Sequence, residues 1–105
     1  MSESLFVERQ FTIDGQEVAC RFYQPERHGQ DYVCRYEILY LDGVRSRRSP
    51  GVDQVQALLL AMQYAHTDLL ATRDHDGRNV TWLDNTSLGL PIAHTIRDLD
   101  PSNPF

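Results

Sequence analysis

The longest periodic pattern of apolar residues runs from Val52 to Ala71 (VDQVQALLLAMQYAHTDLLA) and predicts one long helix. Apolar residues recur there at spacings of three and four, which places them on one face: Val55, Leu58, Leu59, Met62, Ala65 and Leu69. Leu60 and Ala61 widen this stripe. We therefore expect a helix that is covered on more than one side, with Leu59 and Met62 at its buried centre.

Three segments before the helix have strand character: Leu5–Ile13, Glu17–Gln24 and Tyr32–Leu41. Asp14-Gly15 separates the first two and is a strong signal for a two-residue hairpin turn. The second connection, residues 25–30, is polar and contains Pro and Gly, so it predicts a longer hairpin loop. The three segments together predict an antiparallel meander.

Counting outward from these turns predicts three cross-strand pairs on the face that the helix covers: Phe22 with Tyr32, Cys20 with Cys34, and Val18 with Tyr36. Arg9 falls on the same face, opposite Cys20. A charged residue at such a position predicts that the first strand carries a bulge or lies at an edge of the sheet.

The segments around the helix have less regular patterns. Residues 45–51 (RSRRSPG) are expected to connect the sheet to the helix, and Asp53 is the expected N-cap, with Gln56 completing a weak capping box. After the helix, residues 79–84 (NVTWLD) are a candidate fourth strand. Residues 92–99 are compatible with a short helix or strand.

These elements give the order β-β-β-α-β and predict an α+β fold. The architecture is a two-layer sandwich in which one long helix covers an antiparallel meander of three strands, or four if residues 79–84 join it. A chain of 105 residues suits a single domain. We place this domain at residues 1–97 and expect residues 98–105, which contain two prolines, to form a frayed tail.

Composition and charge narrow the partners. The net charge of −5 argues against a nucleic-acid-binding protein, because phosphate contacts need a basic surface. The N-terminal sequence lacks a secretory signal pattern, and the longest apolar cluster, Ala57–Met62, is too short to span a bilayer. We therefore expect no membrane partner, a cytoplasmic location, and reduced thiols at Cys20 and Cys34.

Four short motifs carry a family resemblance: YVCRYEI at residues 32–38, GVDQVQAL at 51–58, TWL at 81–83 and LGLP at 88–91. With these motifs the chain resembles a family of small, uncharacterised bacterial domains, from about Phe11 to Pro91. The resemblance implies a bacterial source and a stand-alone domain. It implies no catalytic residues.

The residues that commonly carry chemistry form no recognisable motif. The four histidines lack the short spacing that prearranges two zinc ligands: His28, His66, His75 and His94. Both cysteines fall inside strands, where a thiol behaves as a small apolar group. The chain has neither a G-x-S-x-G elbow nor a phosphate-binding loop. The sequence thus predicts no catalytic residue, no cofactor and no metal site.

Two features leave a choice open. Arg45, Arg47 and Arg48 lie before the helix, where they either pair with acidic residues in a solvated turn or attract an anion or acidic partner. Trp82 either fills the edge of the core or joins Tyr64 and other tyrosines in a contact surface.

We expect a non-enzymatic protein that acts by protein–protein binding, as an accessory or immunity-like protein. Its partner is another protein or a second copy in a homodimer, because the apolar stripe of the helix is wider than a small sheet can cover. The candidate contact residues are Leu60, Tyr64 and Trp82, with Arg45, Arg47 and Arg48 as a polar rim. The alternative is a small-molecule-binding domain or small enzyme that uses the Arg45–Arg48 turn and a histidine such as His75.

Overall fold

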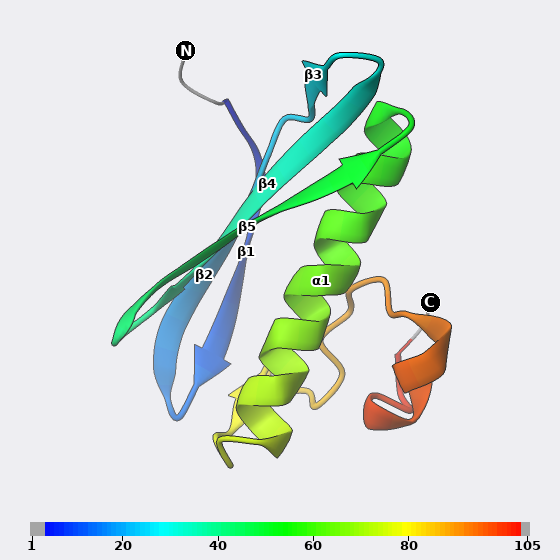
Figure 1. Ribbon diagram of the computed structural model, residues 1–105. Helices are drawn as coiled ribbons and strands as arrows, with labels where there is room; N and C mark the ends of the chain where they lie inside the picture. Colours follow the sequence, from blue (N-terminus) through cyan, green and yellow to red (C-terminus); the bar gives the residue numbers. More distant parts are fainter. Residues whose placement is uncertain (1–3, 104–105) are drawn as a thin grey trace.

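The structure is a computed structural model that describes residues 4–103. Figure 1 shows a twisted sheet, one long helix packed across it, and a C-terminal segment beside the helix. This arrangement confirms the α+β class that the sequence predicts. The sheet, however, has six strands in the described part of the chain, rather than the expected three or four.

Three strands occupy the predicted segments to within one residue at either end: β1 (Leu5–Ile13), β2 (Gln16–Tyr23) and β4 (Asp31–Tyr40). The additional strands are β3 (Glu26–His28), β5 (Gly43–Gly51) and β6 (Val80–Thr81). All pairings are antiparallel. β4 pairs with β5 along one side and with β3 and β2 along the other, and β1 lies between β2 and β6.

The turn between β1 and β2 is the predicted two-residue hairpin. Asp14 and Gly15 have φ of 51° and 82°, the left-handed values that this tight turn requires. Arg9 pairs with Cys20 as the count from this turn predicted, and the expected irregularity of β1 lies between Leu5 and Val7. Phe6 is the extra residue at this bulge.

The predicted register between the second and third strands is wrong by four residues. Phe22 pairs with Tyr36 rather than Tyr32, and Cys20 pairs with Ile38 rather than Cys34. The cause is β3, which uses part of the expected loop to form its own hairpin with the start of β4. Because the shift is even, the side chains stay on the predicted face, and Val18, Cys20, Phe22, Cys34 and Tyr36 are buried.

β5 corrects the expectation that residues 45–51 form an irregular connection. The segment follows a two-residue turn, Leu41-Asp42, and pairs with β4 along its whole length. Its Gly, Ser, Arg and Pro residues have low strand propensity, which hid the strand from a propensity argument. Pro50 is tolerated because β5 is an edge strand.

The helix α1 extends over Gln54–Asp74 and begins at the predicted N-cap. Asp53 Oδ1 accepts a hydrogen bond from the backbone N–H of Gln56 at 2.8 Å. Oε1 of Gln56 in turn accepts a hydrogen bond from the backbone N–H of Val52, one residue before the cap. The sequence therefore placed the start of this helix correctly.

The buried face of α1 agrees with the predicted one only in part: Ala65 and Leu69 are buried as expected, but Val55 and Leu59 are exposed. Its centre is a column of small residues spaced by four, Ala57, Ala61 and Ala65, all fully buried. Small side chains let the helix approach the sheet closely: a Cβ added at Gly51 would lie 2.3 Å from the backbone nitrogen of Ala57. Leu59, expected at the buried centre, is 45 % exposed, and Met62 is half-buried.

The C-terminal segment covers the part of the sheet that the helix leaves open. Leu88, Leu90 and Ile92 enter the core, and a 3₁₀ helix, η1 (His94–Leu99), follows them. Asp100 and Asn103 are buried and hydrogen-bonded, so the chain beyond residue 98 packs against the domain as far as Asn103 instead of fraying. Residues 104–105 of the expected tail, and residues 1–3 of the expected domain, lie outside the described part.

Candidate functional site

Two of the predicted interaction residues, Arg45 and Arg47, converge on one buried carboxylate. Alternate residues of β5 face the helix, and Arg45 Nε and Arg47 NH1 lie 3.0 Å and 3.2 Å from the two oxygens of Asp68 in α1. The hydroxyl of Tyr36 donates a hydrogen bond to the same carboxylate. Burial and this bond raise the pKa of Tyr36 well above its usual value. The arginines thus join β5 to the helix.

The remaining predicted residues do not gather into one site. Tyr64 joins the arginine cluster, since the guanidinium of Arg47 lies 5.6 Å from the centre of its ring. Arg48 lies on the opposite face of β5, where it pairs with Arg35 of β4 across the strands. Leu60 is half-buried in α1, and Trp82 lies in the C-terminal segment beyond β6.

Trp82 has a structural role at the edge of the core. It is half-buried, the guanidinium of Arg9 lies 4.0 Å from the centre of its ring, and Gly89 packs against the six-membered ring of the indole. Arg9 also donates hydrogen bonds to the carbonyl oxygens of Leu88 and Gly89, at 3.1 Å and 2.8 Å. These contacts explain how an arginine is tolerated on the inner face of β1.

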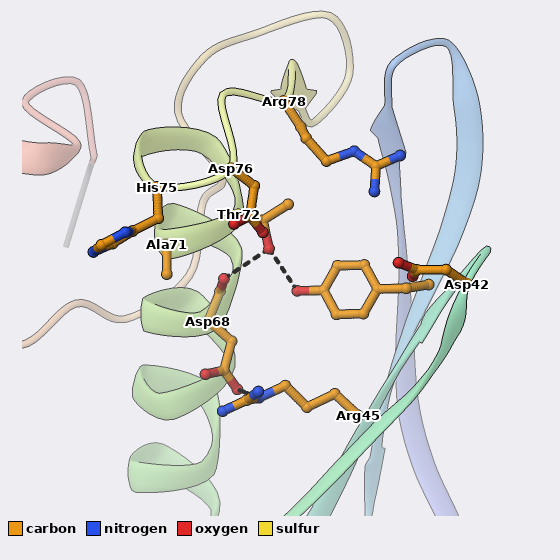
Figure 2. A pocket seen from close by; sticks show the side chains of 9 residues that line it. Asp42, Arg45, Asp68, Ala71, Thr72, His75, Asp76 and Arg78 are labelled. Carbon is orange, nitrogen blue, oxygen red and sulfur yellow. Dashed lines mark hydrogen bonds and ion pairs between the residues drawn. The ribbon is translucent and has the colours of Figure 1, made fainter.

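A polar cavity of about 260 Å³ lies beside the end of α1. Figure 2 shows Arg45 and Asp42 on the side of the β4–β5 hairpin, and Thr72, Asp76 and Arg78 on the other side. Tyr40, which also lines the cavity, shares a hydrogen bond of 2.9 Å with the hydroxyl of Thr72. Charges of both signs therefore surround this cavity.

The histidines are dispersed. His75 lines the polar cavity, although Figure 2 shows its ring directed away from Arg78 and Asp42. His66 is a fully buried residue of α1. Its Nδ1 lies 3.2 Å from the carbonyl oxygen of Pro91, and its Nε2 lies 3.1 Å from Asp100 Oδ2. Burial lowers the pKa of His66, against the opposing effect of these two acceptors. This histidine anchors the C-terminal segment.

Neither thiol is suited to nucleophilic chemistry. Cys20 and Cys34 form no disulfide and are fully buried. Burial raises the pKa of Cys20 to about 12, so its thiolate is scarce at neutral pH. The thiol of Cys34 donates to the carbonyl oxygen of Tyr23 at 3.2 Å. Within residues 4–103, no three His, Cys, Asp or Glu residues are grouped so that they could hold a metal ion.

An exposed apolar surface lies between β1 and α1, and sequence reasoning missed it. Two adjoining cavities lie along this seam, which we call the β1–α1 groove. The first, of about 240 Å³, is lined by Phe6, Gln24, Pro25, Gln54, Val55 and Leu58. The second, of about 250 Å³, is lined by Val7, Glu8, Arg9, Phe22, Met62 and Leu90. The lining residues Phe6 and Val7 are consecutive, and Leu58 and Met62 lie one helical turn apart, so the cavities are neighbours.

The groove is bordered by large apolar side chains that are half exposed or more. Phe6 is 51 % exposed and Val55 65 %, and both line the first cavity, while Val7, 40 % exposed, lines the second. Leu59, 45 % exposed, lies one helical turn from Val55 on α1. The available sequence signal was the run Leu5-Phe6-Val7, which interrupts the alternation of the first strand. The bulge brings Phe6 to the helix side, where it lines the same cavity as Val55.

Residues 7–92 match a family described as a domain of unknown function, DUF6968. The chain belongs to the DUF6968 family. This agrees with the resemblance to an uncharacterised family that the sequence motifs suggested. No curated protein and no solved structure matches the chain.

The DUF6968 match covers the sheet, α1 and the segment that ends at Ile92. It therefore includes both sides of the β1–α1 groove except the residues before Val7. Asp100 and Asn103, whose side chains contact His66 and the carbonyl oxygen of Leu90, lie beyond the matched residues. In the described part of the chain, no helix combines the length and apolar character needed to cross a membrane.

Proposed function

We propose that this DUF6968 domain acts by binding another protein through the β1–α1 groove. The observation that carries the proposal is the exposure of Phe6 and Val55, which line the first of two adjoining cavities, and of Leu59, one helical turn from Val55. Large apolar side chains gathered on one surface commonly mark a protein contact, because covering them removes apolar area from water. An accessory or immunity-like role in a bacterial cytoplasm would use such a surface.

The groove also has the composition of an interaction surface. Its floor is apolar, with Leu58, Met62 and the buried Phe22, while Glu8 and Arg9 supply polar groups at one end. An apolar centre with a polar rim is typical of protein interfaces. The groove replaces Leu60, Tyr64 and Trp82 as the proposed contact surface, because these three are half-buried by their own chain.

Site-specific photo-crosslinking in the source cell tests the proposal. A photoreactive residue at position 59 should form a crosslink to a defined protein, which mass spectrometry identifies, and one at Val44 should not. Val44 is a matched control because it is 60 % exposed but lies on the β4–β5 hairpin, away from the groove. The purified pair should then bind at least about tenfold more weakly with Leu59→Asp. Equal crosslinking at both positions would contradict the proposal.

A second candidate function has its own observation. Arg45 and His75, residue types that a small-molecule site was expected to use, both line the polar cavity beside the end of α1, although the ring of His75 is directed away from Arg78 and Asp42. Arg47 and Arg48 do not line it. Because Arg45, Arg78, Asp42 and Asp76 surround this cavity, its complementary ligand would carry both charges, as a free amino acid does.

Amide chemical shifts during titration with free amino acids would test this second candidate. Binding should move the signals of Tyr40, Thr72 and Asp76, which line the cavity, and Arg45→Ala should weaken the binding. Leu59→Ala, in the β1–α1 groove, is the control and should leave the titration unchanged. Shifts spread evenly over the domain, or none, would count against a site at this cavity.

A further inference from the structure

We propose that the occupant of the β1–α1 groove is a second copy of this chain, so that the domain is a two-fold symmetric homodimer. This inference rests on the function proposed above and names its partner. In a two-fold interface, the same surface patch must supply both the groups that protrude and the hollows that receive them. The groove meets this condition, because Phe6 and Val55 are prominently exposed and also line a cavity of about 240 Å³.

The charges at the groove allow two copies to meet. Glu8 accepts a bond of 2.7 Å from Arg21, and Arg9 donates to the carbonyl oxygens of Leu88 and Gly89. Contact between copies would therefore not bring unpaired charges of Glu8 and Arg9 together. Glu8 and Arg9 line the second cavity, and the residues that line the first, including Gln24 and Gln54, carry no charge.

Four aspartates lie at the other end of the molecule. Asp42 and Asp76 line the polar cavity beside the end of α1, and Asp74 is the last residue of that helix. Asp14 joins the same end through its bond to Arg78. Contact through the groove therefore does not bring these aspartates of the two copies together.

The exposed apolar area reaches the lower limit for a specific dimer. Phe6, Val7, Val55 and Leu59 are 40 to 65 % exposed, which amounts to roughly 300 Å² of apolar area per chain on typical side-chain areas. Two copies would bury roughly 600 Å² of apolar surface. With the usual apolar share of about 60 %, the whole interface would reach ~1,000 Å², the least that a specific interface needs.

Light scattering and sedimentation at micromolar concentration test the dimer. The wild type should have twice the 12.1 kDa mass of one chain. Leu59→Asp and Val55→Asp should raise the dissociation constant at least about tenfold, because each places a charge in the apolar contact. Val44→Asp, exposed on the distant hairpin, should leave the mass unchanged. Circular dichroism confirms that each variant is folded.

Disulfide trapping tests the location independently. Cys20 and Cys34 are buried, so Leu59→Cys adds a reactive thiol at the groove, and Val44→Cys adds one on the hairpin. Mild oxidation should link copies of the Val55→Cys or Leu59→Cys variant severalfold faster than copies of Val44→Cys. Equal rates would overturn the proposed interface.

The outcomes separate this inference from the proposed function. A wild-type mass of one chain, together with a crosslink from position 59 to a different protein, overturns the homodimer and supports binding through the groove. A mass of one chain without any crosslink overturns both. A dimer that Leu59→Asp and Val55→Asp leave intact also overturns the inference, because the copies would then meet through another surface.

Discussion

Gly89 has no side chain, and both its backbone and its neighbour require this. Its φ is +63°, a conformation that residues with a Cβ rarely adopt. A Cβ built there would lie 2.3 Å from Cζ3 of Trp82. The glycine therefore allows the indole to pack between the C-terminal segment and Arg9. The L-G-L-P motif is explained by packing, since Leu88 and Leu90 enter the core on either side of it.

Gly89→Ala should destabilise the fold by about 2 to 5 kcal/mol, combining left-handed backbone strain with overpacking against Trp82. Gly77→Ala is the matched control: Gly77 has φ +66°, but a Cβ there would meet nothing within 4 Å. It should cost only the backbone contribution, about 1 to 2 kcal/mol. Denaturant unfolding measures both free energies. Equal losses would show that the Trp82 contact is unimportant.

Cys20 should make stability depend on pH in the alkaline range. Its pKa is raised by burial from 9.0 to about 12, so the folded protein holds this proton more tightly than the unfolded chain. The stabilisation is complete below pH 9 and is lost as pH rises from 9 towards 12. The free energy of unfolding should fall less steeply over pH 9–11 in Cys20→Ala than in the wild type. Parallel curves would contradict the raised pKa.

At the scale of elements, α1 shows that periodicity predicts a helix better than it predicts the buried face. The helix, its N-cap and most of its length follow from the sequence. The pattern nevertheless allowed either of two neighbouring columns of this helix to be buried. One column contains Leu59, and the other contains Ala57, Ala61 and Ala65. The column of small residues is the buried one because the helix approaches Gly51 closely. Larger side chains would hold the helix away from β5.

The same chemical change at two helix positions tests this assignment. Leu69→Ala should cost about 2 to 5 kcal/mol, because Leu69 is fully buried and its removal leaves a cavity. Leu59→Ala should cost less than about 1 kcal/mol in dilute monomer, because Leu59 is 45 % exposed. Thermal melts at low protein concentration compare the two. A larger loss for Leu59→Ala would show that Leu59 lies at the buried centre of the helix, as the sequence predicted.

β5 illustrates a limit of propensity arguments. Its composition favours a loop, but the turn at Leu41-Asp42 places it next to β4, and nine cross-strand pairs then form. Tertiary contacts add to this pairing, since Arg45 and Arg47 bind Asp68 and Ser49 lies in the core. Strand formation here depends on neighbours that are distant in sequence.

At the scale of the whole molecule, a buried polar cluster attaches the C-terminal segment to the helix. The carboxylate of Asp100 lies 3.1 Å from Nε2 of His66 and accepts hydrogen bonds from the backbone N–H of Leu88 and the side chain of Asn103. Asn103 also donates to the carbonyl oxygen of Leu90. This cluster fixes the segment whose leucines close the core beside β1.

Asp100→Ala should destabilise the protein by about 2 to 4 kcal/mol, because buried groups on His66, Leu88 and Asn103 lose their shared partner. Asp98→Ala, an exposed position two residues earlier, should change the free energy of unfolding by less than about 0.5 kcal/mol. Urea unfolding measures both, and amide exchange at Leu88 reports local loosening. Equal effects would show that the tail contributes no specific contact.

The sequence alone determined the class of the fold, three strand segments, the first hairpin, the helix start and the buried face of the sheet. Each depends on local chemistry: alternation, turn residues with positive φ, and a capping side chain. Of the predicted contact residues, Arg45, Arg47 and Tyr64 proved to be neighbours, but around Asp68, which the sequence did not single out. The other predicted contact residues lie apart.

Only the tertiary structure decided the register of β4, the strand β5, the buried column of α1 and the β1–α1 groove. The register depends on where β3 begins, because an even shift preserves every face and leaves no trace in the hydrophobic pattern. The groove depends on how far α1 and the C-terminal segment extend over the sheet. Distances between elements fix both features, and no local sequence pattern contains those distances.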